Sequence, residues 1–269
     1  MTTPLTRTLL FVPGNRPERF AKALAAGADR VIVDFEDAVQ EADKAQAREH
    51  LQAFLDSNPE ARVWVRVNMA SHGEHGADLV FCRHPGVAGV MLPKAETAVQ
   101  VAAVAAVGKP VMPIIESARG LAAVPALVAV AGVERLTFGG LDLGLDLGLA
   151  AGSVAAERML DQARFALLLQ SRLAAVAAPI DTVFPAFDDL DGLARFARNA
   201  SEMGFAGMLC IHPKQVAAVH QALAPSAEQL AWAQRVVAGN TGTGAYQVDG
   251  QMVDAPVIER AQRLLALAG

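Results

Sequence analysis

The sequence feature that most constrains the fold is a regular alternation of short apolar runs with longer segments rich in Ala and Leu. Eight such runs occur, at residues 8–12, 30–35, 62–67, 88–93, 110–115, 134–139, 179–184 and 205–211. Several are apolar at consecutive positions, as expected for parallel strands buried on both faces. Apolar residues at helical spacing follow the runs, at 17–27, 41–56, 97–107, 119–131, 154–177, 188–203 and 213–223, and more weakly near 74–85. Eight alternating units predict an α/β fold, a closed (β/α)8 TIM barrel.

An open, doubly wound sheet is the alternative arrangement of such units. It is typically accompanied by a Gly-rich phosphate turn after an early strand, but the turn after the first run reads P-G-N-R-P and not G-x-G-x-x-G. The 269 residues also suit one barrel of about 250 residues. We expect residues 1–224 to form the barrel and residues 225–269 to form a C-terminal helical extension that covers its own or a neighbouring active site. This extension is expected to contain two helices, at 226–239 and 254–268, joined by a flexible Gly-rich loop at 240–251.

Composition excludes several other classes of protein. The net charge of −5 gives no basic surface for nucleic acid. The longest apolar stretch without a charge, residues 121–133, is too short to span a membrane, and the N-terminus lacks the features of a signal peptide. The two cysteines, Cys82 and Cys210, lie in apolar surroundings without metal-site spacing, so we expect buried, unreactive thiols. These observations predict a cytoplasmic protein that binds neither nucleic acid nor membrane.

Polar residues end most of the apolar runs. In a barrel of this kind the active site lies at the C-terminal ends of the strands, where charges are costly unless they are paired or bind a ligand. The residues concerned, from the first run to the last, are Arg16, Asp34, Glu36, Asp37, Arg66, Asn68, Lys94, Glu96, Glu116, Asp142, His212 and Lys214. The seventh run has no clear candidate. The pattern predicts a charged pocket at one end of the barrel.

Glu116 and Asp142 are the strongest candidates for a metal site. They end consecutive runs, and adjacent strands lie only about 4.8 Å apart, so the two carboxylates repel each other unless a cation lies between them. Mg²⁺ suits such a site because it prefers oxygen ligands and retains waters that a substrate can replace. No cluster of Cys and His indicates zinc instead. The alternative is that each carboxylate pairs with an arginine, such as Arg119.

Arg66 is suited to bind a substrate carboxylate with two hydrogen bonds, which lysine cannot do. Alternatively it neutralises Glu36 or Asp37 across the barrel mouth, and both roles are compatible. The segment 35–38 can orient metal-bound waters, or it can cap the helix that begins near Glu41.

The histidines carry less information. We interpret His72, His75 and His84 as solvated residues of a polar loop and His212 as a packed structural residue. Asp146 repeats the D-L-G unit one turn after Asp142 and is expected to shape the loop.

These residues fall in motifs that resemble the citrate lyase β-subunit-like family, within the HpcH/HpaI aldolases and malyl-CoA lyases. The motifs cover essentially the whole chain and are specific for the family, although less so for the substrate. They are L-F-V-P-G-N-R-P-E-R-F (10–20), V-D-F-E-D-A-V (33–39), R-V-N (66–68), M-L-P-K-A-E (91–96), I-I-E-S-A-R-G (114–120), F-G-G-L-D-L (138–143), C-I-H-P-K-Q-V (210–216) and G-Q-M-V-D-A-P (250–256).

The resemblance implies a homo-oligomer, a trimer or a multiple of trimers, with Mg²⁺ held by Glu116 and Asp142. It implies that Arg66 grips the carboxylate of a 2-oxo acid such as oxaloacetate, pyruvate or glyoxylate. Asp254 resembles an acid/base residue that a neighbouring subunit contributes. Catalytic roles for Glu36 and Asp37, and substrate contacts from Arg16 and Lys94, complete the expected site. The chain departs from the family at Phe35, where Leu is common, and at Leu141, where an acidic residue is common. Leu141 changes the polarity of the pocket wall.

The implied activity is that of a Mg²⁺-dependent carbon–carbon lyase. It would cleave a 3-hydroxyacyl-CoA thioester, such as citryl-, citramalyl- or malyl-CoA, into acetyl-CoA and a 2-oxo acid, or catalyse the reverse condensation. One alternative is a metal-dependent aldolase that acts on 4-hydroxy-2-oxo acids without CoA, against which the M-V-D-A-P motif argues. The other is a non-catalytic subunit that binds CoA or a keto acid, against which the retained Glu116/Asp142 pair argues.

Overall fold

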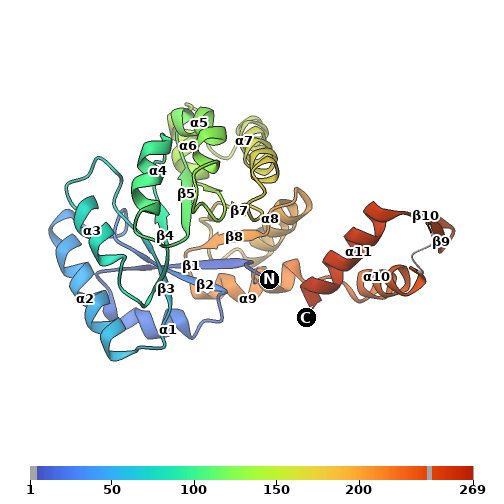
Figure 1. Ribbon diagram of the computed structural model, residues 1–269, viewed down its shortest axis with the longest axis horizontal. Helices are drawn as coiled ribbons and strands as arrows, with labels where there is room; N and C mark the ends of the chain where they lie inside the picture. The colour runs from blue at the N-terminus through green and yellow to red at the C-terminus, as the bar shows by residue number, and fades with distance from the viewer. Residues whose placement is uncertain (1–4, 241–243, 269) are drawn as a thin grey trace. The chain divides into compact units, whose positions relative to one another are not determined.

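Eight parallel strands close into a barrel in the computed structural model, which describes residues 5–240 and 244–268 (Figure 1). The strands are β1 (Thr8–Pro13), β2 (Arg30–Asp34), β3 (Val63–Arg66), β4 (Val87–Leu92), β5 (Val111–Ile115), β6 (Thr137–Phe138), β7 (Ile180–Asp181) and β8 (Gly207–Cys210). Each strand pairs with the next, and β8 closes the ring by pairing with β1 in the register Leu9↔Leu209. The TIM-barrel prediction is confirmed.

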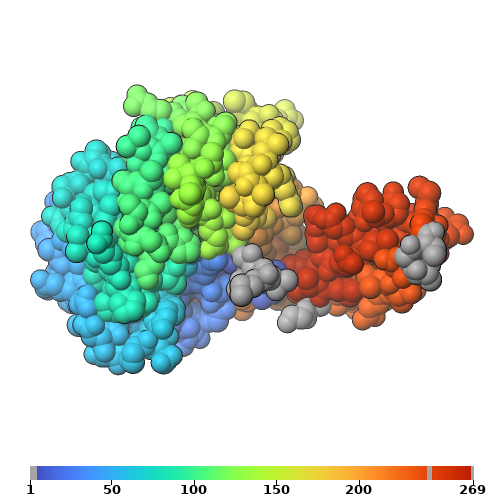
Figure 2. Space-filling view, in the orientation of Figure 1, coloured from blue at the N-terminus to red at the C-terminus, as the bar shows by residue number. Residues whose placement is uncertain are grey.

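Helices surround the barrel. They are η1 (Pro17–Arg19), α1 (Phe20–Leu24), η2 (Glu41–Asp43), α2 (Lys44–Ser57), α3 (His75–Phe81), α4 (Ala98–Ala105), α5 (Ala118–Val128), α6 (Gly140–Asp146), α7 (Val154–Leu173), α8 (Leu190–Glu202) and α9 (Pro213–Leu223). On one side of the barrel α4, α5 and α7 lie side by side (Figure 2). Side-chain caps fix where these helices begin, since Thr97 accepts the N–H of Gln100, Ser117 that of Gly120 and Ser153 that of Ala156. The sequence pattern did not predict α6.

The barrel interior is a packed apolar core and not a channel. The buried side chains that meet there come from seven of the eight strands: Leu9, Ile32, Trp64, Met91, Met112, Ile114, Ile180 and Leu209. Burial of each large apolar side chain stabilises the fold by roughly 1.5–3 kcal/mol. Because this plug fills the centre, a substrate can reach only the ends of the strands.

Both cysteines are inaccessible in this fold. Cys82 and Cys210 are 0% exposed, and burial raises the pKa of the Cys210 thiol to about 12 and that of Cys82 further. Neither forms a disulfide. The prediction of buried thiols is confirmed. No helix within residues 5–240 and 244–268 is long and apolar enough to cross a membrane.

The chain divides into two compact units, residues 1–222 and 223–269. The second unit contains α10 (Ala227–Gly239), the antiparallel pair β9 (Tyr246–Val248) and β10 (Gln251–Val253), and α11 (Ala255–Ala268). Its small core consists of Ala233, Val236, Val253 and Ala261.

The prediction of a flexible loop at 240–251 is wrong for its second half, which forms a β-hairpin; residues 241–243 lie outside the described residues. Asp249 and Gly250 both have positive φ, 51° and 78°, as a two-residue hairpin turn requires. The Asp-Gly pair is a strong hairpin signal, so the sequence did carry the information.

Candidate active site

Glu116 and Asp142 line the same small cavity, of about 70 Å³, at the C-terminal end of the barrel. Glu116 follows β5 directly, is 6% exposed, and accepts the backbone N–H of Lys94 at 2.7 Å. Asp142 does not end β6, as we had expected, but lies in the first turn of α6. Gly139 permits the close approach of these elements, since a Cβ at this position would lie 2.5 Å from Oε2 of Glu116.

This carboxylate pair is not neutralised by a direct ion pair, although the charges of Lys94 and Arg66 act on Glu116 from nearby. Among the residues that the structure describes, no arginine or lysine forms an ion pair with Glu116 or Asp142. Arg119, the alternative partner, lies 3.6 Å from Glu96 instead. Burial, together with the charge of Asp142, raises the pKa of Glu116 to about 7. Two neighbouring oxygen donors without a cation fit a Mg²⁺ ion, which accepts one or two carboxylates and completes its shell with water or substrate oxygens.

Arg66 lines the same cavity, and its principal partner is Asp34. Nε and Nη2 donate to the two carboxylate oxygens of Asp34 at 2.7 and 2.6 Å, while Nη1 lies 3.1 Å from Glu36 and 3.4 Å from Asp37. The expected pairing with Glu36 and Asp37 is therefore present. The Nε/Nη2 edge of the guanidinium, however, is already bound by Asp34. The sequence analysis missed Asp34 as the partner, although Asp34 and Arg66 are direct neighbours in the β2–β3 register.

Glu36 holds a proton near neutral pH. It is 6% exposed, and burial raises its pKa to about 8 although Arg66 acts in the opposite direction. Three carboxylates, those of Asp34, Glu36 and Asp37, share one guanidinium, and the Nζ of Lys94 is 3.9 Å from Glu36. A group that titrates near neutral pH beside a cavity can act in proton transfer.

Lys94 contributes through both its backbone and its side chain. Its φ of 47° is unusual for a residue with a side chain and aims the N–H at Glu116. Burial alone would lower the pKa of Lys94, but the charges of Glu116 and Glu36 outweigh burial and raise it.

The remaining strand-end candidates have partners of their own. Arg16 does not line the cavity; it lies beyond β1, where its Nε is 2.7 Å from Glu18 and both side chains are about half exposed. Asn68 is buried in a structural network, since it accepts from the buried Lys44 at 2.6 Å and donates to Asp78 at 2.7 Å.

The three histidines interpreted as solvated, His72, His75 and His84, are partly exposed, and each has a partner within 3.2 Å. The interpretation therefore missed these hydrogen bonds, with Glu41, the carbonyl of Asn68 and Asp56 respectively. His212 stacks on Phe187, with ring centroids 5.0 Å apart, which agrees with the structural role expected for it.

Asp254 lies in the second unit, at the start of α11. Its Oδ1 is 3.4 Å from the N–H of Val257, the geometry of an N-cap, and the side chain is only partly buried.

Comparison with known proteins decides the family. The family model described as HpcH/HpaI aldolase/citrate lyase matches residues 7–213. The chain belongs to this family. Its relatives include a "Citrate lyase subunit beta-like protein" of Mycobacterium tuberculosis, 40% identical over 97% of this chain and 94% of the relative. Another is human "Citramalyl-CoA lyase, mitochondrial", 29% identical over 97% of this chain and 85% of the relative.

A solved structure extends the likeness to the whole chain. The crystal structure of protein CitE from Mycobacterium tuberculosis, in complex with magnesium, acetoacetate and coenzyme A, superposes with a TM-score of 0.87. It is 38% identical, and the match covers 99% of both chains. The family resemblance inferred from the motifs is therefore confirmed.

Proposed function

We propose that the protein is a Mg²⁺-dependent carbon–carbon lyase that cleaves a 3-hydroxyacyl-CoA thioester into an acyl-CoA and a 2-oxo acid. The observation that carries this proposal is the pair of carboxylates, Glu116 and Asp142, which line one cavity with Arg66 and form no ion pair with any arginine or lysine that the structure describes. The relatives named for citrate lyase and citramalyl-CoA lyase, and a neighbour solved with magnesium and coenzyme A, support the same chemistry. Citryl-, citramalyl- and malyl-CoA are the substrates of this class.

Glu116 and Asp142 would hold the ion. When bound, Mg²⁺ supplies Lewis-acid stabilisation of negative charge on the substrate oxygen. We assign the carboxylate of the 2-oxo acid portion to Nη1 of Arg66, where it would replace the contacts of this nitrogen with Glu36 and Asp37. The contact with Asp34 fixes the guanidinium in place. Lys94 adds a second positive charge near the carboxylate pair. For Arg16, which is exposed beyond β1, we propose a peripheral contact with substrate.

Two proton transfers accompany the cleavage. The substrate hydroxyl loses its proton, the bond to the thioester α-carbon breaks, and the resulting enolate takes up a proton at carbon. Asp37, and Glu36 in its ionised form, both beside Arg66, are the groups on the barrel that we assign to accept this first proton. We assign the second transfer to the carboxyl group of Asp254. In the condensation direction the same carboxylate removes the α-proton of acetyl-CoA.

We further propose that the active assembly is a homo-oligomer, a trimer or a multiple of trimers, in which Asp254 reaches the barrel of a neighbouring chain. A head-to-tail ring supplies every barrel with one such tail.

The function is tested by measuring acetyl-CoA release from citryl-, citramalyl- and malyl-CoA, with Mg²⁺ and with EDTA. Release from at least one thioester that EDTA abolishes is the expected result. Cleavage of a free 4-hydroxy-2-oxo acid at a higher rate than any thioester would favour the CoA-independent aldolase. Binding of CoA or keto acid without turnover of any substrate would favour a non-catalytic subunit.

A further inference from the structure

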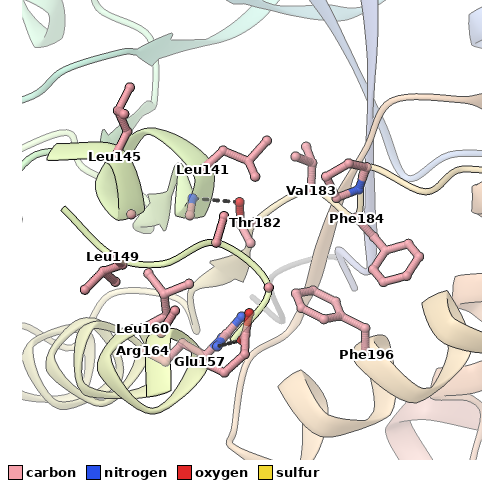
Figure 3. A pocket seen from close by; sticks show the side chains of 16 residues that line it. Leu141, Leu145, Leu149, Glu157, Leu160, Arg164, Thr182, Val183, Phe184 and Phe196 are labelled. Atoms are coloured by element: carbon pink, nitrogen blue, oxygen red, sulfur yellow. Dashed lines mark hydrogen bonds and ion pairs between the residues drawn. The ribbon is translucent and has the colours of Figure 1, made fainter. Parts of the chain in front are cut away.

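A second, larger cavity, of about 320 Å³, lies beside the metal cavity. It lies between α6, the first half of α7, the segment after β7, and α8 (Figure 3), and it is open to solvent on the side of Leu145, which is 82% exposed. Its wall is mostly apolar and is formed by Leu141, Leu145, Leu149, Leu160, Phe184 and Phe196. A cavity of this size and lining is suited to a small organic group.

The two cavities are adjacent and share part of their lining. Leu141, Thr182 and Val183 line both of them. The hydroxyl of Thr182 accepts the N–H of Gly140 at 2.9 Å, so it is held in place at this boundary. A single layer of side chains therefore separates a ligand bound at Glu116 and Asp142 from the larger cavity.

The charges around the larger cavity favour a neutral substituent. In the described lining only Arg164 and Glu157 are charged. The guanidinium of Arg164 is shared by three carboxylates, because Nε is 3.1 Å from Asp181 while Nη1 is 2.9 Å from Asp161 and 3.5 Å from Glu157. No positive charge is left for an incoming anion, so a carboxylate would meet net negative charge here.

We propose that the larger cavity receives an uncharged alkyl or aryl substituent of the substrate, carried on one of the two carbons whose bond is cleaved. This inference rests on the proposed function and narrows its substrate class to 3-hydroxyacyl thioesters with an apolar branch. The branch can come from the 2-oxo acid, as a longer chain, or from the acyl-CoA, as an alkyl group on the α-carbon. Both sources present the same chemistry to the cavity.

The test measures how binding and turnover depend on chain length. Calorimetric titrations in Mg²⁺ buffer compare pyruvate, 2-oxobutanoate and 2-oxohexanoate, with 2-oxoadipate as the acid whose chain ends in a second carboxylate. A second arm measures condensation of glyoxylate with acetyl-, butyryl- and hexanoyl-CoA. If the branch belongs to the 2-oxo acid, each added methylene is expected to improve the affinity of the acid about fourfold. If it belongs to the acyl-CoA, each methylene is expected to improve kcat/KM of the condensation about fourfold. 2-Oxoadipate is expected to bind more weakly than 2-oxohexanoate.

Variants with larger side chains in the cavity test whether the dependence on chain length arises at this site. Ala156 lines the cavity and is 5% exposed, so Ala156→Leu places a larger side chain inside it. Gly144→Leu is a second filled variant, because a Cβ at Gly144 meets no atom within 4 Å and the backbone can accept it. Ala155→Leu is the matched control, since it adds the same atoms at an exposed position of the same helix, outside the lining. In Ala156→Leu and Gly144→Leu, affinity and kcat/KM should no longer rise with the chain length of the substrate. In Ala155→Leu this rise should be retained.

Three outcomes contradict the inference, and they separate it from the proposed function. If short acids and thioesters react but longer uncharged ones gain nothing in either arm, the inference is overturned while the lyase activity stands. If the gain with chain length persists in both filled variants, the substituent lies elsewhere and the inference is again overturned. If no acid and no thioester gives product or binds, the proposed function fails and the inference fails with it.

Discussion

Among the described residues, Glu116 and Asp142 form no ion pair with an arginine or lysine, unlike Asp34 and Glu96. Asp34 is bound by Arg66, and Glu96 lies near Arg119. A buried carboxylate beside a second one is unfavourable unless a positive charge is supplied from outside the chain. The absence of a pairing arginine is thus the feature that distinguishes a metal pair from a structural one, and spacing in the sequence could not reveal it.

Glu116→Gln and Asp142→Asn are each expected to abolish Mg²⁺-dependent activity, because each removes a charged oxygen ligand while keeping the side chain's shape. Calorimetry with Mg²⁺ and circular dichroism measure the loss of binding and the retained fold. Asp146→Asn is the matched control, since Asp146 lies on the same helix but accepts the N–H of Ala118, which an amide oxygen can also do. Normal turnover by either ligand variant would contradict the assignment.

The raised pKa of Glu36 predicts a pH dependence of stability. Its pKa is about 8 in the folded protein, against an ordinary value of 4.5, so between these values the unfolded chain ionises while the folded one keeps the proton. The free energy of unfolding should therefore fall as pH rises through this window, with a contribution of up to about 1.4 kcal/mol per pH unit. Urea denaturation of the parent and of Glu36→Gln at pH 5, 6, 7 and 8 measures this. The variant should lack this contribution, and parallel curves would mean that Glu36 is ionised.

At the scale of elements, the short helix α6 positions Asp142. Its sequence, G-L-D-L-G-L-D, contains two glycines, each of which disfavours a helix by about 1 kcal/mol relative to alanine, so local propensity argued for a loop. Tertiary contacts decide otherwise, because the N–H of Gly140 is bound by Thr182 and Asp146 is bound to the start of α5.

Two glycine substitutions test how tightly α6 is fitted against Glu116. Gly139→Ala should reduce Mg²⁺-dependent turnover at least tenfold, because the new Cβ would lie 2.5 Å from Oε2 of Glu116 and must displace it. Gly144→Ala is the control within the helix: its Cβ meets open space, and it should stabilise the protein by roughly 0.5–1 kcal/mol with unchanged turnover of short substrates. Steady-state kinetics and thermal unfolding of both variants distinguish a local displacement from general loss of fold.

How far the sequence predicts this molecule depends on the range of the interactions involved. Runs of consecutive apolar residues located all eight strands, because a strand that is buried on both faces needs an apolar side chain at nearly every position. The rule that active sites lie at the strand ends led to Arg66, Glu116 and Asp142, and these three residues line one cavity in the structure. Sequence did not show that Asp34 is the main partner of Arg66 or that α6 forms, since both depend on contacts between segments far apart in the chain. The hairpin at 246–253 was a different error: its Asp-Gly turn is a local signal that the glycine-rich context obscured.

At the scale of the whole molecule, the second unit has its own small apolar core. This core can hold the start of α11, and with it Asp254, in a defined position within the unit. Asp254 caps α11, and that geometry is compatible with a structural role alone. An asparagine caps a helix as well as an aspartate does, so Asp254→Asn should leave stability almost unchanged. A catalytic acid, by contrast, would lose most of its rate on this change.

Whether Asp254 serves a neighbouring barrel can be decided by mixing two inactive variants. Asp254→Asn retains an intact barrel, and Glu116→Gln retains an intact tail, so each is expected to be inactive alone. When they are co-refolded in equal amounts, random assembly of a ring in which tails act between chains pairs an intact barrel with an intact tail at about a quarter of the sites. Activity approaching that fraction of the parent's, in oligomers shown by mass spectrometry to be mixed, would establish sharing between chains. Mixed oligomers without recovered activity would rule out a tail that acts on a neighbouring chain.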